Sequence, residues 1–180
     1  MRTGDPVLKK LFSRQDIATT VKDLGRRIEN DFVNEEILFV CLLKGSFIFT
    51  SDLVRQVANP SRVDFMRVSS YGNQMTTRGN VEIIKDLEED IEDKNVVIVE
   101  DIIDSGLTLS RVKDMLLTRK PKVLKICALI DKRCRREVEI EGDYVGFTID
   151  DGFVVGYGID YAEYYRNCPD ICVVVEENEV

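Results

Sequence analysis

Three carboxylates and a short glycine-containing turn lie close together near the middle of the chain. Glu100 and Asp101 follow residues 96–99, which are four β-branched apolar residues typical of a buried strand. Asp104 then opens the turn Asp-Ser-Gly-Leu-Thr, and apolar residues at helical spacing follow. In an open α/β sheet, ligands bind beyond the carboxyl ends of strands, and the first amides of the next helix attract anions. The segment therefore predicts an anion site beside acidic groups that can hold sugar hydroxyls or a divalent metal. A phosphorylated ribose needs both.

Each residue of this turn also has an ordinary structural interpretation. Asp104 can act as a general base beside the anion site, or it can simply cap the following helix. The next residues can bind phosphate through amides and hydroxyls, or they can form an unremarkable helix start, which would itself attract anions. Glycine in the turn lets a ligand approach without meeting a Cβ atom. The four candidates for phosphate binding are Ser105, Gly106, Leu107 and Thr108.

Two lysines follow other predicted strands. Lys44 comes directly after residues 37–43, a continuous apolar run typical of a parallel strand buried on both faces. The sequence around Lys44 lacks the G-x-x-x-x-G-K-[ST] frame, which excludes a P-loop nucleotidase. Lys132 follows the apolar residues 123–130. Either ammonium can be a solvated surface charge or can face a ligand, and Lys132 would then donate to a carbonyl oxygen.

Near the end of the chain, the candidates are weaker. Phe153 starts a short apolar segment, so it can pack in the core or stack on a flat base. Asp160 and Arg166 lie in a tyrosine-rich segment with nearby glycines, where they can form a surface ion pair or belong to a site.

Composition narrows the chemistry. The 180 residues carry a net charge of −8, which disfavours broad nucleic-acid binding, and they contain no histidine. Catalysis by Ser-His-Asp or Cys-His groups is therefore excluded. The five cysteines have no C-x-x-C spacing, which disfavours zinc and indicates free thiols. No apolar run is long enough to span a membrane, and the start lacks a signal-peptide pattern, so we expect a cytoplasmic protein.

The pattern of elements predicts an α/β fold, with a central, mostly parallel twisted sheet flanked by helices. We expect a single domain over residues 1–180, with a small hood built from both ends of the chain, roughly 1–16 and 145–170. A capping box at Ser13–Asp16 starts a helix through residue 28. Residues 71–79 are polar with two glycines and are expected to form a mobile loop. The other expected helices cover 47–57 and the segment after 106, and the expected strands are 37–43, 63–70, 81–85, 96–99, 123–130, 144–147, 153–157 and 171–175.

Taken together, these motifs resemble the purine phosphoribosyltransferases of the hypoxanthine–guanine type, from about residue 16 to residue 175. Residues 99–108 resemble that family's phosphoribosyl pyrophosphate motif, and residues 43–46 resemble its pyrophosphate loop, which often has a non-proline cis peptide before the lysine. Residues 64–72 resemble the strand that leads into the family's closing loop. Residues 150–166 resemble its base-binding and metal-binding tail. The resemblance implies the type I phosphoribosyltransferase fold.

The resemblance also implies a reaction in which a 6-oxopurine and phosphoribosyl pyrophosphate give a nucleoside monophosphate and pyrophosphate. Glu100 and Asp101 would hold the ribose hydroxyls and the surroundings of Mg²⁺, the implied cofactor. Asp104 would accept the proton from N7 of the base. The phosphoribosyl group would also contact Ser105, Gly106, Leu107 and Thr108.

The purine would be bound by residues of the last strands and the tail. Lys132 would donate to its 6-oxygen, Phe153 would stack on its ring, and the backbone of Val154 would contact its edge. Asp160 would lie beside the purine and help hold a second Mg²⁺. The pyrophosphate ligands would be Lys44, Gly45 and Arg166.

Two other functions use similar features. A nucleotide-sensing regulator of the same fold would bind RNA, and a phosphoryl-accepting signalling domain would hold Mg²⁺ at acidic strand ends. The net charge disfavours the first, and the second leaves Lys132 and the tail without a role. We therefore expect small-molecule partners, no nucleic acid and no membrane, and the family precedent suggests a homodimer or homotetramer.

Overall fold

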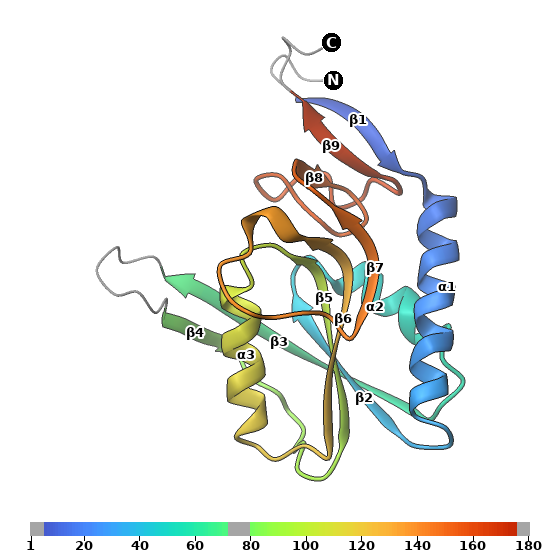
Figure 1. Ribbon diagram of the computed structural model, residues 1–180, viewed down its shortest axis with the longest axis vertical. Coiled ribbons are helices and arrows are strands. Elements are labelled where there is room, and N and C mark those ends of the chain that lie inside the picture. Colours follow the sequence, from blue (N-terminus) through green and yellow to red (C-terminus); the bar gives the residue numbers. More distant parts are fainter. Residues whose placement is uncertain (1–5, 72–79, 176–180) are drawn as a thin grey trace.

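The computed structural model describes residues 6–71 and 80–175, and a six-stranded sheet forms the centre of this part (Figure 1). Its strands lie in the order β4-β3-β2-β5-β6-β7. All neighbouring pairs are parallel except β3 and β4, which are antiparallel. The predicted α/β fold with a mostly parallel sheet is confirmed. The bounds are β2 (Ile37–Leu43), β3 (Ser61–Tyr71), β4 (Asn80–Lys85), β5 (Asn95–Ile103), β6 (Val123–Lys132) and β7 (Tyr144–Ile149).

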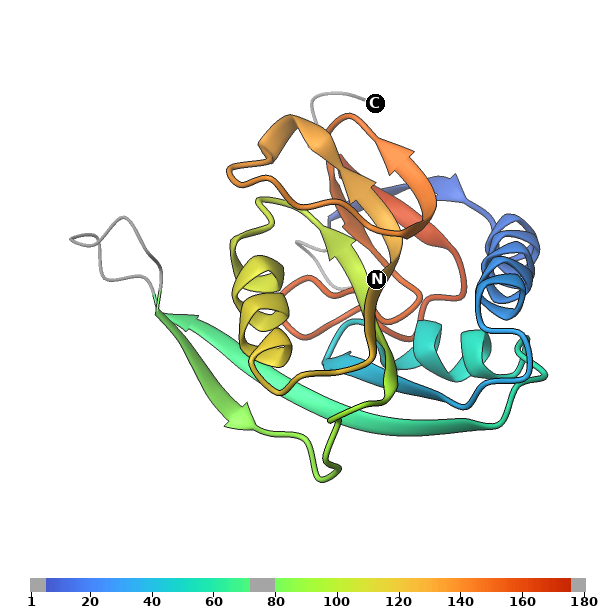
Figure 2. The ribbon, with the colours of Figure 1, turned by 60° about the horizontal axis from the view of Figure 1, so that its bottom comes forward.

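Helices cover both faces of this sheet (Figure 2). The helices α1 (Arg14–Asp31) and α2 (Phe47–Val54) lie on one face, and α3 (Leu107–Leu117) lies on the other. Alternate residues of a strand point to opposite faces, so a central strand between two helical layers must be apolar throughout. This is why β2 is one uninterrupted apolar run, with Phe39 in the α1–α2 cluster and Val40 in the α3 cluster.

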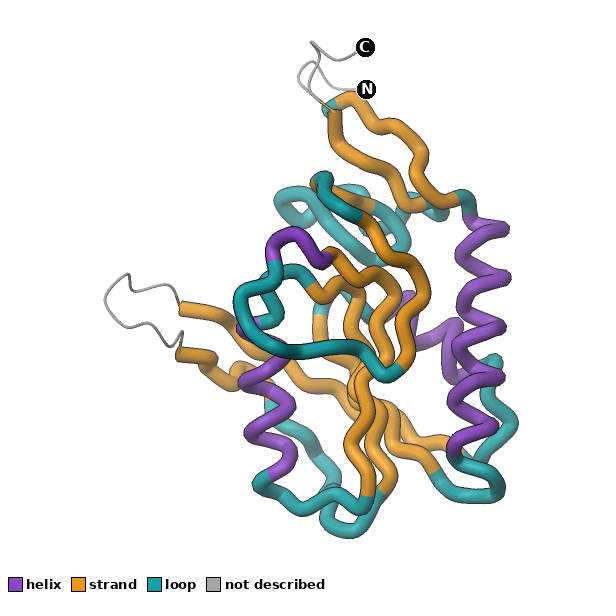
Figure 3. Tube along the Cα trace, in the orientation of Figure 1, coloured by secondary structure: helices purple, strands orange, loops and turns teal. Residues whose placement is uncertain are grey.

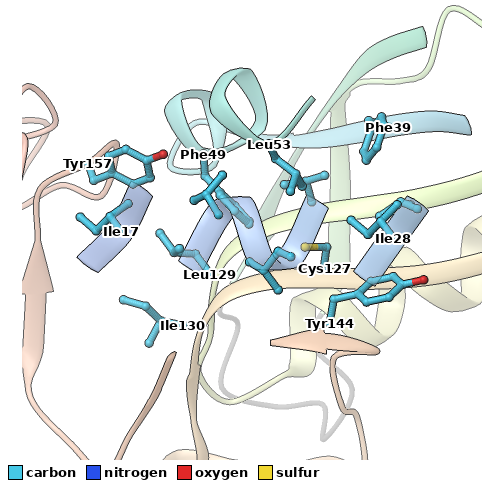
Figure 4. Close-up of a cluster of buried hydrophobic side chains, with 14 of the residues drawn as sticks. Ile17, Ile28, Phe39, Phe49, Leu53, Cys127, Leu129, Ile130, Tyr144 and Tyr157 are labelled. Atoms are coloured by element: carbon cyan, nitrogen blue, oxygen red, sulfur yellow. The ribbon is translucent and has the colours of Figure 1, made fainter. Parts of the chain in front are cut away.

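The core on the α1–α2 face contains the larger side chains (Figure 4). Phe39 and Phe49 are fully buried there, together with Leu53. Tyr157, from the C-terminal part of the chain, closes one end of this cluster and donates its hydroxyl to Asp52 at 2.6 Å. The packing of α2 therefore fixes the segment that follows β8 as well as the central sheet.

A second, antiparallel sheet joins the two ends of the chain. It contains β1 (Val7–Phe12), β9 (Ile171–Val175) and β8 (Phe153–Val155), in the order β1-β9-β8. The expected hood thus contains β1 and β8 and also β9, which lies beyond residue 170, whereas β7 belongs to the central sheet. The strand β1 was not predicted, because Lys9 and Lys10 interrupt its apolar pattern on an exposed edge.

Local signals account for most other boundaries. The capping box of α1 is present: the hydroxyl of Ser13 accepts from the amide of Asp16 at 3.2 Å, and the carboxylate of Asp16 accepts from the amide of Ser13 at 2.9 Å. The expected mobile loop, apart from Tyr71 at the end of β3, lies outside the described residues. Among the described helices, none is both long enough and apolar enough to cross a membrane.

Among the boundaries that differ from the prediction, the end of β5 matters for the candidate site. The strand expected over residues 96–99 continues to Ile103, so Glu100 and Asp101 lie inside β5 rather than after it. Pairing with β2 stops at Val99, opposite Cys41, whereas pairing with β6 continues to Ile103, opposite Asp131. The two carboxylates therefore lie where β2 separates from β5.

Candidate functional site

The carboxyl ends of three adjacent parallel strands form the floor of the candidate site. Lys44 follows β2, Asp104 follows β5, and Lys132 ends β6. Because these strands are neighbours in the sheet, their ends lie at the same edge. Loop segments lie between this edge and the smaller sheet (Figure 3), and they include the tail between β8 and β9.

The turn after β5 presents free backbone amides. Gly106 is the residue before α3 and has a left-handed backbone with φ of 80°. In the described part of the chain, the amides of Ser105, Gly106 and Thr108 have no acceptor. Unpaired amides at a helix start carry partial positive charge and bind anions well. The turn expected to bind phosphate therefore has the geometry for it.

Asp104 has one carboxylate oxygen in an unusual state. Its Oδ1 is buried and meets no hydrogen-bond donor in the described residues. Its Oδ2 lies 3.9 Å from Nζ of Lys132 and 3.6 Å from Nη1 of Arg135. A buried acceptor without a donor is costly, so this oxygen is suited to receive a proton or a hydrogen bond from a ligand.

Lys132 is not a solvated surface charge. Its side chain is only 7% exposed, and its ammonium donates to the carbonyl of Gly152 at 3.0 Å. Asp151 lies 3.4 Å away. The ammonium thus stands between the end of β6 and the turn before β8. The ammonium therefore lies near the carboxylate of Asp104, at the place expected to bind the purine.

The two carboxylates inside β5 differ in surroundings. A Cβ atom placed on Gly45 would collide with the carboxylate of Asp101, so Asp101 lies directly across the loop that follows β2. Burial, and then the neighbouring charge of Asp101, raise the pKa of Glu100 well above its usual range. Within the described residues, neither carboxylate has an ion-pair partner.

Hard carboxylate oxygens with no protein cation beside them suit Mg²⁺. No three acidic or thiol side chains converge on one point in the described residues. Mg²⁺ in such a place would keep waters and take substrate oxygens, as it commonly does with few protein ligands. The oxygens of Asp160 are already occupied, by Arg166 at 2.8 Å and by the amide of Glu163 at 2.8 Å.

The two cations expected to bind pyrophosphate lie together. The peptide bond between Leu43 and Lys44 is cis. The ammonium of Lys44 lies 2.9 Å from the carboxylate of Glu163, and the guanidinium of Arg166 lies 3.2 Å from the same oxygen. These two contacts lower the pKa of Glu163. A carboxylate therefore stands between the two cations, where an anionic ligand would bind.

Close backbone packing holds the tail against the loop after β2. Gly158 has φ of 102°, and a Cβ atom there would collide with the carbonyl oxygen of Gly45. Arg166 donates to the carbonyl of Gly158 at 2.9 Å. Only glycine fits at residue 158 for both reasons, its backbone angle and its distance to Gly45.

The aromatic candidate is available to a ligand. Phe153 is 51% exposed, and its ring meets that of Tyr161 edge to face, with centroids 5.4 Å apart. Val154 is buried, and its backbone is paired with Val173 in the small sheet. Phe153 therefore does not pack in the core, in contrast to the ordinary interpretation of its apolar segment.

Sequence reasoning missed three residues of the site. Glu163, Arg135 and Arg136 contact Lys44, Asp104 and the phosphate turn respectively. Arg135 and Arg136 belong to a charged turn, and Glu163 to a tyrosine-rich segment, and neither pattern distinguishes them from surface charges. Only the fold brings them to the site.

Comparison with known proteins gives consistent matches. The phosphoribosyl transferase domain family matches residues 8–162. The chain is 49% identical over 168 residues to a hypoxanthine-guanine phosphoribosyltransferase of Aquifex aeolicus, covering 93% of this chain and 94% of that protein. It is 52% identical over 162 residues to a hypoxanthine phosphoribosyltransferase of Salmonella typhimurium, covering 89% and 91%. A crystal structure of a hypoxanthine-guanine phosphoribosyltransferase from Bacillus anthracis has a TM-score of 0.91 at 50% identity, covering 95% of this chain and all of that one.

Proposed function

The chain belongs to the hypoxanthine–guanine phosphoribosyltransferases, and we propose that the site at the ends of β2, β5 and β6 carries the family's reaction. The enzyme transfers the 5-phosphoribosyl group of phosphoribosyl pyrophosphate to N9 of hypoxanthine or guanine. The products are IMP or GMP and pyrophosphate, as in purine salvage. The buried, unpartnered oxygen of Asp104, between Lys132 and the anion-binding turn, is the observation that carries this assignment of the site.

The ribose 5-phosphate binds the turn that starts α3. The free amides of Ser105, Gly106 and Thr108 support this role. The carboxylates of Glu100 and Asp101 would take the ribose hydroxyls and would hold Mg²⁺, which their hard oxygens fit. When bound, Mg²⁺ neutralises charge on the pyrophosphate leaving group.

The purine lies between Lys132 and Phe153. The ammonium of Lys132 donates to the 6-oxygen, and the exposed ring of Phe153 stacks on the base. The backbone of Val154 contacts the edge of the base. Asp104 takes the proton from N7, which makes N9 a better nucleophile. The free acceptor of Asp104 close to Lys132 supports this placement.

Pyrophosphate leaves from the opposite side of the ribose. Lys44, the amide of Gly45 and Arg166 bind it, and their positive charge stabilises the negative charge that collects on the leaving group. Asp160 holds Arg166 at 2.8 Å and thereby orients it, and it would help to hold a second Mg²⁺ only if that pairing were released.

Replacing Asp104 by asparagine tests the site. The amide has the same shape but cannot accept a proton, so kcat should fall about 10²- to 10⁴-fold. The affinity for phosphoribosyl pyrophosphate should stay within about threefold, since the phosphate binds backbone amides and not this carboxylate. Steady-state kinetics and calorimetric binding measure both quantities.

Asp151→Asn is the matched control for Asp104→Asn. Asp151 is also a carboxylate beside Lys132, but it is 76% exposed. Its replacement should change kcat less than about threefold. Full activity of Asp104→Asn, or an equal loss in both variants, would refute the assignment of the base.

We also propose that the enzyme is a cytoplasmic homo-oligomer. All five cysteines are unpaired thiols, as is usual in a reducing compartment. The exposed side chains of Val63 and Phe65 share one side of β3, and Phe47 is exposed at the start of α2, beside Lys44. An exposed apolar surface of this kind favours burial against a second copy. In sedimentation experiments, the wild type should be a dimer or tetramer, and Phe65→Glu should be a smaller species. A monomeric wild type would refute the proposal.

A further inference from the structure

The phosphate turn, residues 104–108, packs on one side against the segment that follows β6. The amide of Glu137 donates to the carbonyl of Ser105 at 2.9 Å. A Cβ atom placed on Gly106 would lie 2.5 Å from Cγ2 of Ile140 and 3.1 Å from Cδ of Arg136. The turn is therefore tightly packed against residues 136–140, and its position depends on them.

Arg136 makes most of the polar contacts with this side of the turn. Its Nε donates to the carbonyl of Asp104 at 3.1 Å, and its Nη2 lies 3.4 Å from the carbonyl of Ile103. It also donates to the carbonyl of Ile140 and to the carboxylate of the buried Asp131. A guanidinium offers five donors in a fixed planar arrangement, so one side chain can hold several acceptors at once.

These contacts determine which way the amides of the turn point. In a trans peptide unit, the carbonyl and the following N–H point in opposite directions. The carbonyls of Ile103, Asp104 and Ser105 are all bonded to residues 136 and 137. The amides that follow them, from Asp104 to Gly106, must therefore point away from Arg136. Those of Ser105 and Gly106 are among the free amides assigned to phosphate.

We propose that Arg136, with Asp131 as its counter-ion, is a positioning residue that orients this turn for the transfer reaction. It touches no substrate. It fixes the peptide planes so that their amides face the ribose 5-phosphate, and it holds the backbone of Asp104 so that the carboxylate faces the purine. This inference rests on the phosphate site assigned under the proposed function.

Arg133 provides a matched control in the same ion-pair cluster. Its Nε also bonds to Asp131, at 2.9 Å, but its side chain is 70% exposed, against 17% for Arg136. Within the described residues, the guanidinium of Arg133 contacts no carbonyl of the turn. A role in general stability would involve both arginines, whereas a positioning role involves Arg136 alone.

The test is the binding of GMP and of pyrophosphate to Arg136→Lys, measured by calorimetry. Lysine keeps the charge and the aliphatic stem but loses the planar set of donors. We expect GMP to bind at least tenfold more weakly and pyrophosphate to bind within twofold of the wild type, because pyrophosphate contacts Lys44 and Arg166 instead. Arg133→Gln should bind both ligands within twofold. Wild-type affinity for GMP in Arg136→Lys, or equal losses for GMP and pyrophosphate, would overturn the inference.

A variant of the phosphate ligands separates failure of this inference from failure of the proposed site. The substitution Thr108→Pro removes one of the free amides and one hydroxyl from the turn, within the first turn of α3, where proline is tolerated. If it binds GMP like the wild type, the phosphate site itself is wrong and the inference fails with it. If it weakens GMP binding while Arg136→Lys does not, only the positioning role is refuted.

A measurement on the unliganded wild type does not depend on how the variants fold. If Arg136 fixes the turn in advance, the ¹⁵N order parameters of Ser105 and Gly106 should match those of β5, near 0.85. Values below about 0.6 at these two amides would show that the turn is not held in the free protein and would refute the inference.

Discussion

At the scale of single residues, the site combines groups whose surroundings give them their roles. Lys132 and Asp104 are both ordinary in the sequence, yet the fold buries the ammonium of one and leaves an oxygen of the other without a donor. Lys132 can therefore donate a hydrogen bond to an oxygen of a purine, and Asp104 can accept a proton from it. Solvated groups of the same types would be much less selective.

Lys132 should set the preference for 6-oxopurines. Adenine has an amino group at this position and offers no acceptor to an ammonium. Lys132→Met should lower kcat/KM for hypoxanthine about 10- to 100-fold, which corresponds to the loss of a charged hydrogen bond of about 1.5–3 kcal/mol. The slow rate with adenine serves as the internal control and should not fall. An equal fall with both bases would contradict the assignment.

The roles of residues could be predicted from the sequence where these residues lie within a recognisable motif. The acidic pair, Asp104 and the turn were all recognisable because they follow an apolar run and precede a helix. Glu163 and Arg136 could not be identified this way, since a charged residue in a polar segment has no pattern that indicates a partner far away in the chain. Their contacts depend on residues 119 and 32 positions distant, Lys44 and Asp104 respectively.

At the scale of elements, apolar patterns located nearly every strand, and pairing decided where each one ends. The continuous run of β2 was predicted with its bounds because both faces of this strand are buried. The end of β5 was misplaced, because carboxylates usually mark a strand end. Here the strand stays paired with β6 after it leaves β2. The sequence of β5 alone does not indicate how far its pairing with β2 and with β6 extends.

The contact between the tail and the loop after β2 should depend on Gly158. Alanine there would need a left-handed backbone and would collide with the carbonyl of Gly45. We expect Gly158→Ala to weaken pyrophosphate binding at least tenfold, because Arg166 and Lys44 would be pushed apart. Calorimetry with pyrophosphate and Mg²⁺ measures this change.

Gly152 is the matched control for Gly158. It has a similar backbone, with φ of 115°, but its Cβ atom would meet nothing closer than 3.4 Å, at Val173. Gly152→Ala adds the cost of the backbone angle without the collision. It should keep pyrophosphate affinity within about threefold. If both variants lose affinity equally, backbone strain and not the packing of the tail is responsible.

At the scale of the whole molecule, the small sheet depends on both ends of the chain and must be attached to the central one. Asp170, just before β9, pairs with Lys10 of β1 at 2.7 Å and accepts from the amide of Arg14 at 2.8 Å, so it links the small sheet to the start of α1, which covers the central sheet. The hydrogen bond from Lys10 and the charge of Lys10, with the amide of Arg14, lower the pKa of Asp170. Asp170 thus joins the C-terminal part of the chain to its N-terminal part.

This lowered pKa predicts how stability responds to acid. A carboxyl whose pKa is lower in the folded than in the unfolded state stabilises the fold above its unfolded pKa, near 3.9, and loses that contribution as the pH falls through the folded value. Asp170→Asn should therefore be less stable than the wild type at pH 7, and the difference should shrink below about pH 4. Thermal unfolding at several pH values measures this, and a constant difference would contradict it.

The overall charge is negative, although the proposed substrates are anions. The chain carries −8, while the proposed site holds Lys44 and Arg166 together around Glu163, and Lys132 beside Asp104. Charges beyond about 10 Å are largely screened at 0.1 M salt. Attraction of phosphoribosyl pyrophosphate is therefore a local property of the site and not of the molecule.

If Lys44 and Arg166 bind pyrophosphate as proposed, the carboxylate of Glu163 between them makes that binding an exchange of one anion for another. Pyrophosphate must displace the carboxylate of Glu163 from the two cations when it binds, and the carboxylate pairs with them again when pyrophosphate leaves. The net affinity is then weaker than two free cations would give, which favours rapid release of the product. Glu163→Gln should hold pyrophosphate several-fold more tightly and make it a stronger product inhibitor, and unchanged inhibition would show that no such competition exists.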